Sequence, residues 1–220
     1  MMGHAGMAAA AVRYLRADPA DSRGGTTRPE PVVEALPRPE LRCVGENERA
    51  PVDQTQFRRV LGAFATGVTV ITAPAPGPSA QDGARALAEP PAGFACQSFS
   101  SLSLDPPLVA FMVGRTSTTW PRIARAGVFC VNVLGADQGE LCRRFAVSGA
   151  DKFAGVAHTP APVTGSPRLA GAAAWIDCVI HAVHTGGDHL IVVGRVEALD
   201  TDDGTPPLLF HRGRFGQLRT

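Results

Sequence analysis

The sequence lacks the features that mark several large classes of protein. Its 220 residues hold no run of about 18 or more apolar residues, so no segment is predicted to cross a bilayer as a helix. The apolar stretch over residues 7–12 is too short for the core of a secretory signal. A net charge of +1 with no basic stripe argues against nucleic acid or an anionic membrane as a partner. We therefore expect a cytoplasmic protein.

Cysteine is scarce and scattered. The five cysteines form no Cys-x-x-Cys pair: Cys43, Cys96, Cys130, Cys142 and Cys178. Such a set predicts neither a disulfide scaffold nor a zinc site, and we expect the thiols to pack in a reduced interior. His181 and His184 stand three apart in a predicted strand, where odd separations point to opposite faces. We therefore expect no metal site.

The usual nucleotide and nucleophile motifs are also absent. No Gly-x-Gly-x-x-Gly follows a predicted strand, and no Gly-x-x-x-x-Gly-Lys-Ser/Thr occurs. There is no Gly-x-Ser-x-Gly, so hydrolysis by an activated serine has no support. A nucleotide bound by this chain must be held in another way.

The chain divides into two parts by composition. Residues 1–50 alternate alanine-rich and proline-rich stretches without a sustained period, and proline at this density blocks helices and strand ladders. We predict that they form a disordered or loosely packed extension. Because 45% of all residues are hydrophobic, residues 51–220 can form one domain with a sizeable core.

Three helices are predicted in the folded part, at residues 53–67, 118–127 and 137–145. Their predicted N-terminal caps are Asp53 with Gln56, Thr118 or Thr119, and Asp137 with Glu140. Apolar residues recur at helical spacing along the first helix, and we expect that face to belong to the core.

Strand patterns outnumber helical ones, and they cover residues 68–72, 108–113, 128–134, 173–184 and 189–199. The last two are joined by a short turn that contains Gly186 and Gly187, which predicts an antiparallel hairpin. Regular crossover helices are missing between the strands. We therefore predict a mainly β protein, an antiparallel split barrel with a few packing helices.

A serine-rich run over residues 93–109 is the most unusual part of the sequence. It places hydroxyl and amide side chains in an otherwise apolar, strand-prone segment that ends in Pro106-Pro107. Hydroxyls and backbone N–H groups suit a phosphorylated ligand. On composition alone, however, an ordinary surface loop is the favoured interpretation.

The folded part resembles the short-chain NAD(P)H:flavin reductases, which are the reductase components of two-component flavin-dependent monooxygenases. The resemblance is carried by motifs such as Gln97-Ser98-Phe99-Ser100-Ser101 and Gly187-Asp188-His189, and it covers residues 57–62, 66–72, 97–109, 129–134, 144–145, 151–155, 187–189 and 207–215. Residues 94–99 are most similar to the type that includes the reductase partner of a steroid-ring hydroxylase.

This resemblance implies an FMN-binding split barrel that reduces FMN or FAD, with FMN favoured, using NADH or NADPH, with NADH favoured. Hydride would pass directly from the nicotinamide to flavin N5, so no acid-base residue is required, and His189 would position the nicotinamide. The implied cofactor-binding residues are Cys96, Gln97, Ser98, Phe99, Ser100, Ser101, Ser103, Ser117, Thr118, Asn132, Val133, Arg144, Phe145, Lys152, Phe153, His189, Arg212, with Arg214 as its alternative, and Phe215.

Within this set, Lys152 would be the cation for the flavin phosphate, and Asn132 a donor beside the ring. An alternative role for Asn132 is a hydrogen bond at the end of its strand, and His189 could be an ordinary turn residue. The chain departs from the family pattern at Ala95-Cys96-Gln97 and at His211.

The resemblance also implies a homodimer and a monooxygenase that receives the reduced flavin. Two alternatives stay open at this point: a flavin-binding protein without catalysis, and a related split-barrel enzyme that keeps FMN tightly bound and acts on another substrate.

Overall fold

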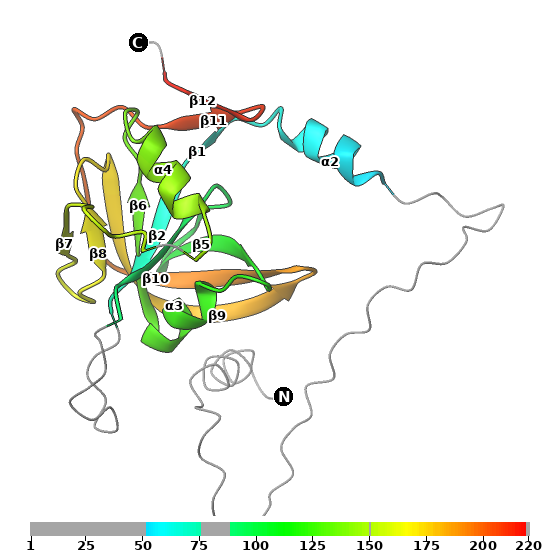
Figure 1. Ribbon diagram of the computed structural model, residues 1–220. Helices are drawn as coiled ribbons and strands as arrows, with labels where there is room; N and C mark the ends of the chain where they lie inside the picture. The colour runs from blue at the N-terminus through cyan, green and yellow to red at the C-terminus, as the bar shows by residue number, and fades with distance from the viewer. Residues whose placement is uncertain (1–51, 76–88, 150, 219–220) are drawn as a thin grey trace, which may run out of the picture.

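The structure is a computed structural model, and it describes residues 52–75, 89–149 and 151–218 (Figure 1). The predicted extension over residues 1–50 and most of the loop over residues 74–91 lie outside the described residues. Within the described ranges there are three helices: α2 (Gln54–Leu61), α3 (Trp120–Ala126) and α4 (Gly139–Ala146).

The main element is a seven-stranded antiparallel sheet. In spatial order its strands are β3 (Ala92–Cys96), β2 (Thr69–Ala73), β6 (Val128–Val133), β9 (Ala174–Gly186), β10 (His189–Thr201), β5 (Pro107–Gly114) and β4 (Ser100–Leu104). The prediction of a mainly antiparallel β fold with a few helices is confirmed.

Smaller strands flank this sheet. One group is β1 (Thr66–Gly67), β11 (Leu209–His211) and β12 (Arg214–Gly216), and the other is β7 (His158–Pro160) with β8 (Pro167–Leu169). The helices α3 and α4 pack close to the main sheet, whereas α2 projects from it (Figure 1). No helix in the described ranges has the length and apolarity that a membrane crossing needs.

The two edge strands of the sheet, β3 and β4, are consecutive in the chain, and the segment between them draws the edges together. Ser98 Oγ donates to Met112 O and accepts from Met112 N, each at 3.0 Å, so one side chain pairs with β5 as a backbone would. Cys96 Sγ lies 3.3 Å from the same hydroxyl. Ser98 therefore closes the barrel between β3 and β5.

The predicted hairpin forms from β9 and β10, which pair from His189 opposite Gly186 to Thr201 opposite Ala174. Alternate residues of β10 face the core, as the sequence period indicated, with Val192 fully buried. Gly194 shares this face, directly against the buried ring of Phe129.

Replacing Gly194 with alanine should lower the free energy of unfolding by about 2 kcal/mol, because the new Cβ would overlap the Phe129 ring and lie 3.2 Å from Cys178 Cβ. Urea denaturation measures the effect. As a control, Gly216→Ala on β12 meets no atom within 4 Å and should change stability little. Equal effects at the two positions would contradict the packing described here.

The four cysteines in the described part of the chain are buried and unpaired, as expected: Cys96, Cys130, Cys142 and Cys178. Burial raises the pKa of the Cys130 thiol to about 12, with a further contribution from the charge of Asp177. Among the described residues no group of three or more His, Cys, Asp or Glu side chains could hold a metal ion.

The predicted helix starts need two corrections. α3 has Thr119, one of the two predicted residues, at its N-cap position, but the Thr119 side chain makes no bond to the helix, and Ser117 Oγ instead accepts from Trp120 N at 3.2 Å. α4 has Gln138 at its N-cap without a side-chain bond to the helix, because Gln138 Oε1 instead accepts from Gly135 N. The predicted cap by Asp137 and Glu140 is therefore wrong.

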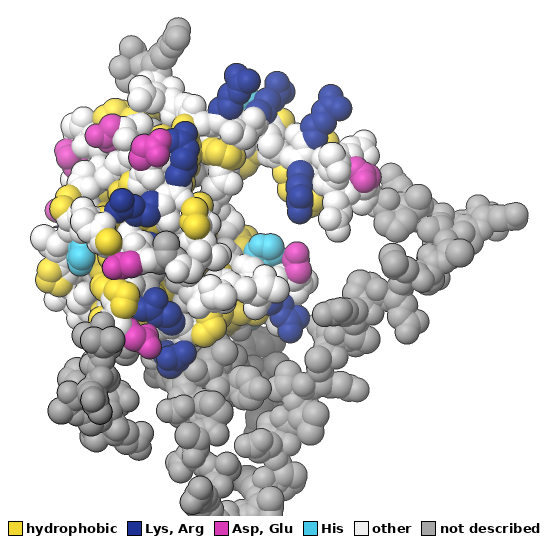
Figure 2. All heavy atoms as spheres, in the orientation of Figure 1, with side chains coloured by type: hydrophobic (Ala, Val, Ile, Leu, Met, Phe, Trp, Pro, Cys, Tyr) yellow, Lys and Arg dark blue, Asp and Glu magenta, His cyan; other side chains and the backbone are white. Residues whose placement is uncertain are grey.

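The first predicted helix begins correctly but ends early and is not part of the core. Asp53 Oδ1 accepts from Gln56 N at 2.8 Å, as the capping box predicts, and the helix stops at Leu61 because Gly62 caps it. None of its residues is buried. Figure 2 shows a hollow in the molecular surface between α2 and the β9–β10 hairpin.

Candidate functional site

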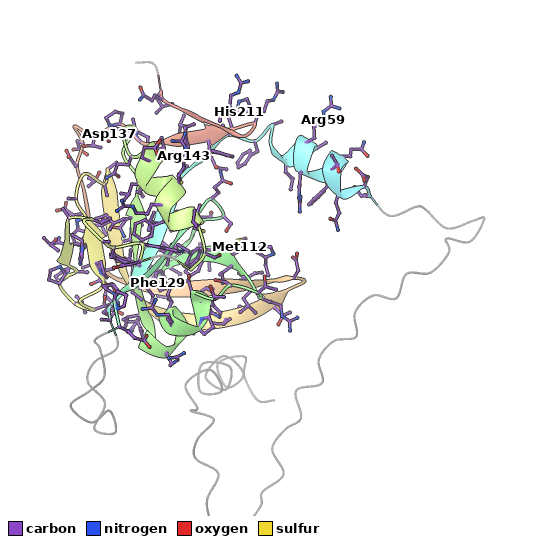
Figure 3. The ribbon with its side chains drawn as sticks, viewed as in Figure 1. Arg59, Met112, Phe129, Asp137, Arg143 and His211 are labelled. Carbon is purple, nitrogen blue, oxygen red and sulfur yellow. The ribbon has the colours of Figure 1, made fainter. Side chains whose placement is uncertain are left out.

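The end of β5 brings two of the predicted motifs close together. Gly114 on β5 pairs with His189 at the start of β10, and Met112, two residues earlier, bonds to Ser98. The serine-rich segment and the Gly-Asp-His turn therefore flank β5 from opposite sides, within roughly 10 Å of each other, since neighbouring strands lie about 5 Å apart. Met112 itself is exposed beside the hollow (Figure 3).

His189 stands at the rim of this region with its side chain half exposed. Its Nδ1 lies 2.7 Å from Asp188 Oδ1, and this hydrogen bond, with the charge of the histidine, lowers the pKa of Asp188. A Cβ on Gly114 would lie 3.9 Å from His189 Nε2, so this nitrogen faces the end of β5. Asp188 thus orients a ring that a planar ligand could meet.

Most of the serine-rich run is strand and not surface loop: it covers the end of β3, the connecting residues 97–99, all of β4 and the start of β5. Its side chains differ in how free they are to contact a ligand. The Ser98 hydroxyl is hydrogen-bonded to the backbone of Met112. Phe99 packs against the main core, and Cys96 is buried. Gln97, Ser100, Ser101 and Ser103 remain on the edge strand or just before it, with Gln97, Ser100 and Ser101 exposed. The side chains with room for a ligand are therefore Gln97, Ser100 and Ser101.

Thr118 and Lys152 share one polar cavity of about 210 Å³. Lys152 Nζ donates to Gly93 O and Phe145 O, both at 3.1 Å, which leaves one of its three N–H groups for another acceptor. Burial lowers the pKa of Lys152, and the nearby charge of Arg122 lowers it further. The cavity is lined by Pro90, Pro91, Gly93, Thr118, Thr119, Arg122, Gly149, Asp151 and Lys152.

Arg122 is a cavity residue that the sequence analysis missed. Its Nε is buried, lies 3.5 Å from Glu89 Oε2, and makes no hydrogen bond within the described part of the chain. Two cations and two threonine hydroxyls around so small a space match the chemistry of a phosphate. Nothing in the sequence showed that this face of α3 meets Lys152.

Three predicted ligand residues instead lie in the interior. Phe145 and Phe153 are buried in an edge-to-face pair with centroids 5.1 Å apart. The side chain of Asn132 is fully buried: Nδ2 lies within 3.3 Å of Val70 O and Pro167 O, and Oδ1 accepts from Leu169 N at 2.7 Å. These contacts correct the assignment of Asn132 as a donor to the flavin, because its polar atoms already have partners.

The remaining candidates lie elsewhere. Val133 is half-buried in β6, between Thr69 and Ala174. Arg212 is in the β11–β12 turn, with a φ of 48°. Phe215 packs under Arg143, whose Cζ lies 5.1 Å from the centroid of the Phe215 ring.

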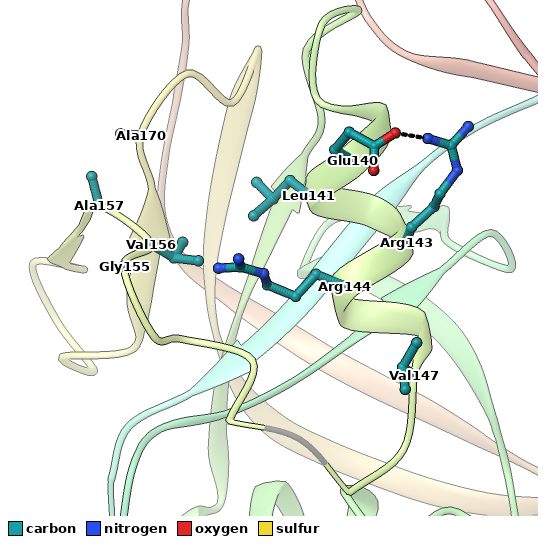
Figure 4. Close-up of a pocket in the computed structure, with 9 residues that line it drawn as sticks. All are labelled: Glu140, Leu141, Arg143, Arg144, Val147, Gly155, Val156, Ala157 and Ala170. Atoms are coloured by element: carbon teal, nitrogen blue, oxygen red, sulfur yellow. Dashed lines mark hydrogen bonds and ion pairs between the residues drawn. The ribbon is translucent and has the colours of Figure 1, made fainter.

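Arg144 lines a second, larger pocket and donates to Ala154 O at 2.6 Å. This pocket, of about 580 Å³, lies between α4 and residues 155–157 (Figure 4). The structure does not bring Arg144 into the cavity of Thr118 and Lys152.

Comparison with known proteins gives a consistent result. The family model described as "Flavin reductase like domain" matches residues 61–219. The chain is 48% identical to the reductase subunit HsaB of a flavin-dependent monooxygenase from Rhodococcus jostii, over 74% of this chain and 77% of that protein. It is 45% identical to a flavin reductase from Pseudomonas putida, over 80% of this chain and 96% of that protein.

Solved structures agree with this assignment. The NADH:FAD oxidoreductase SgcE6 of Streptomyces globisporus superposes with a TM-score of 0.66 at 35% identity, covering 83% of this chain and all of that one. A nitrilotriacetate monooxygenase component B homologue from Mycobacterium thermoresistibile superposes with a TM-score of 0.67 at 45% identity, covering 76% of this chain and 87% of that one. With a matched region that spans most of its length and relatives this similar, the chain belongs to the flavin reductase family.

Proposed function

We propose that this chain is an NADH-dependent flavin reductase that reduces FAD or FMN and supplies the reduced flavin to a separate monooxygenase. The observation that carries the proposal is the family match over residues 61–219, together with relatives named as reductase subunits of such monooxygenases. Relatives named for NADH with FAD and for NADH with FMN both occur, at 37% and 38% identity.

The residues present fit a flavin. The buried Arg122 Nε without a hydrogen bond and the remaining N–H of Lys152 would hold its phosphate, with Thr118. Gln97, Ser100 and Ser101 would donate along its length, and His189 would orient the nicotinamide at the end of β5. When bound, the flavin accepts hydride from the nicotinamide, so the chain contributes alignment and electrostatics.

Lys152→Met should weaken FMN binding about tenfold, because it removes one charge-assisted hydrogen bond to the phosphate. Riboflavin, which has no phosphate, should bind the variant and the wild type equally, and fluorescence titration measures both. Lys152→Arg is the matched control, since it keeps the charge. A parallel loss of riboflavin affinity would mean that Lys152 acts only through the α4 carbonyl that it caps.

We further propose a cytoplasmic homodimer. NADH is maintained in the cytoplasm, and a reductase that releases reduced flavin must work where its monooxygenase does. The dimer is supported by apolar surface that one copy leaves uncovered on α2.

Steady-state kinetics with FAD or FMN and with NADH or NADPH test the proposed function. We expect NADH oxidation that depends on added flavin and shows saturation with it. Flavin binding without nicotinamide oxidation would instead indicate a non-catalytic flavin-binding protein. Flavin retained stoichiometrically through purification would indicate the related class that keeps its cofactor and acts on another substrate.

A further inference from the structure

The pocket between α4 and residues 155–157 has no part in the function proposed above. Its volume of about 580 Å³ is within the range of cavities that enclose small organic ligands. It shares no lining residue with the polar cavity that contains Lys152. We call it the α4 pocket, and its lining consists of Glu140, Leu141, Arg143, Arg144, Val147, Gly155, Val156, Ala157 and Ala170 (Figure 4).

Hydrogen bonds at both ends of the α4 pocket hold its two walls together. At one end Arg144 reaches across from α4, and its Nη1 donates to Ala154 O at 2.6 Å (Figure 4). At the other end Gln138 Nε2 donates to Ala170 O at 2.7 Å. Ala170 N in turn donates to Ala157 O at 3.0 Å, which fixes the outer wall. The pocket is therefore formed before a ligand enters it.

Most of the side chains that line the pocket are apolar. Leu141 and Val156 are half-buried, and both pack against the apolar cluster that contains Phe145 and Phe153. Val147, at the end of α4, is 57% exposed. An apolar ligand that covers these side chains removes their surface and its own from water, which favours binding. A wholly polar ligand gains nothing from this surface.

The charged side chains of the pocket differ in how free they are to bind a ligand. Arg143 is paired with Glu140, and its guanidinium lies over the ring of Phe215. Arg144 forms no ion pair with a residue in the described part of the chain, and its bond to Ala154 O uses one of its five N–H groups. A guanidinium in this state can bind one carboxylate through two parallel hydrogen bonds. The neighbouring carboxylate of Glu140 opposes a second negative charge on the ligand.

We propose that the α4 pocket is an effector site for a monocarboxylate with an apolar ring body. The ring would lie on Leu141 and Val156, and the carboxylate would accept hydrogen bonds from Arg144. Nucleotides do not match this lining, because their phosphate charges would meet Glu140 and the polar edges of their bases would face apolar side chains.

The two walls of the pocket also hold Lys152, which connects the pocket to the proposed flavin site. Lys152 Nζ donates at 3.1 Å to the backbone oxygen of Phe145, the residue after Arg144. Phe153 follows Lys152 in the chain and packs edge-to-face on Phe145, with centroids 5.1 Å apart. A ligand that joins the two walls would hold Lys152 in place, so flavin and effector should each raise the affinity of the other. This step rests on the proposed function, whereas the ligand site itself does not.

Binding of 2-naphthoate to the full-length chain tests the site, because this fluorescent probe is an apolar ring system with one carboxylate. We expect one saturable site, and we expect 2-naphthalenemethanol, which has the ring without the charge, to bind about tenfold more weakly. Arg144→Gln should weaken naphthoate binding to a similar extent, and Ala157→Trp should abolish it by filling the pocket from an exposed position.

Arg125→Gln is the matched control for these variants, because Arg125 is an exposed arginine at the end of α3 that lines neither cavity. It should bind naphthoate as the wild type does. Equal affinity for the two probes, or naphthoate binding that is unchanged in both Arg144→Gln and Ala157→Trp, would overturn the proposed site.

Titration of FMN with and without saturating naphthoate tests the coupling. The Kd for FMN should fall about fivefold when naphthoate is present, in the wild type and in Arg125→Gln but not in Ala157→Trp. Displacement of naphthoate by FMN, or an FMN affinity that does not respond to naphthoate, would overturn the effector role. A chain that binds naphthoate through Arg144 but neither binds nor reduces flavin would contradict the proposed function and leave the ligand site intact.

Discussion

Replacement of Asn132 with leucine is expected to lower the free energy of unfolding by about 3–4 kcal/mol, because it removes four hydrogen bonds of a fully buried side chain and leaves the buried Leu169 N–H without its acceptor. Leu169 N loses its acceptor at 2.7 Å, and Val70 O and the hydroxyl of Thr72 lose a donor at 3.2 Å each. These bonds join β6 to β2 and β8. Urea denaturation followed by circular dichroism measures the loss.

Ser100→Ala is the control for this variant, since it removes one exposed hydrogen bond to Ser101 O and should change stability by less than about 0.5 kcal/mol. The measurement also separates the two roles that the sequence left open for Asn132. If Asn132→Leu kept wild-type stability and lost only flavin affinity, the side chain would be a cofactor ligand, and the buried network described above would be wrong.

His189→Ala is expected to lower kcat/KM for NADH about 10- to 100-fold, because nicotinamide alignment depends on a ring fixed at the rim of the site. Asp188 holds that ring through a 2.7 Å hydrogen bond. Affinity for flavin in the absence of nicotinamide should stay within about twofold of the wild type, since the phosphate cavity is lined by other residues. Steady-state kinetics and flavin titration give the two values.

His181→Ala is the matched control, because His181 is an exposed histidine on β9 of the same hairpin. We expect wild-type kinetics from it. An unchanged kcat/KM in the His189 variant would mean that His189 is an ordinary turn residue. Equal losses of flavin and nicotinamide affinity would mean that His189 contacts the flavin instead.

The sequence predicted the sheet and the hairpin well because strand periods and turn residues are local signals. The Asp53 cap is equally local, and it forms as predicted. The exposure of α2 was not predictable: the spacing of Phe57, Val60 and Leu61 shows that one face of the helix is apolar, but a pattern of this kind does not say whether that face packs against the same chain.

The site was less accessible to sequence reasoning because its chemistry depends on long-range contacts. The sequence around a strand asparagine is the same whether its side chain bonds to a ligand or to a backbone group far along the chain. Asn132 bonds to the backbone of Leu169, 37 residues away. Likewise Ser98 belongs to a hydroxyl-rich motif, yet its bonds to Met112 close the barrel. Arg122 belongs to no motif that the sequence analysis found. It becomes a candidate phosphate ligand only because α3 packs beside Lys152 in the structure.

Anaerobic mixing of the purified protein with NADH and an excess of free FAD tests the central claim most directly. We predict that the concentrations of oxidised flavin and of NADH, both followed by absorbance, fall in a one-to-one molar ratio over many turnovers per chain, and that the reduced flavin passes a filter that retains the protein. Reduction that stops at one flavin per chain, or no loss of NADH with either FAD or FMN, would contradict the assignment as a reductase of free flavin.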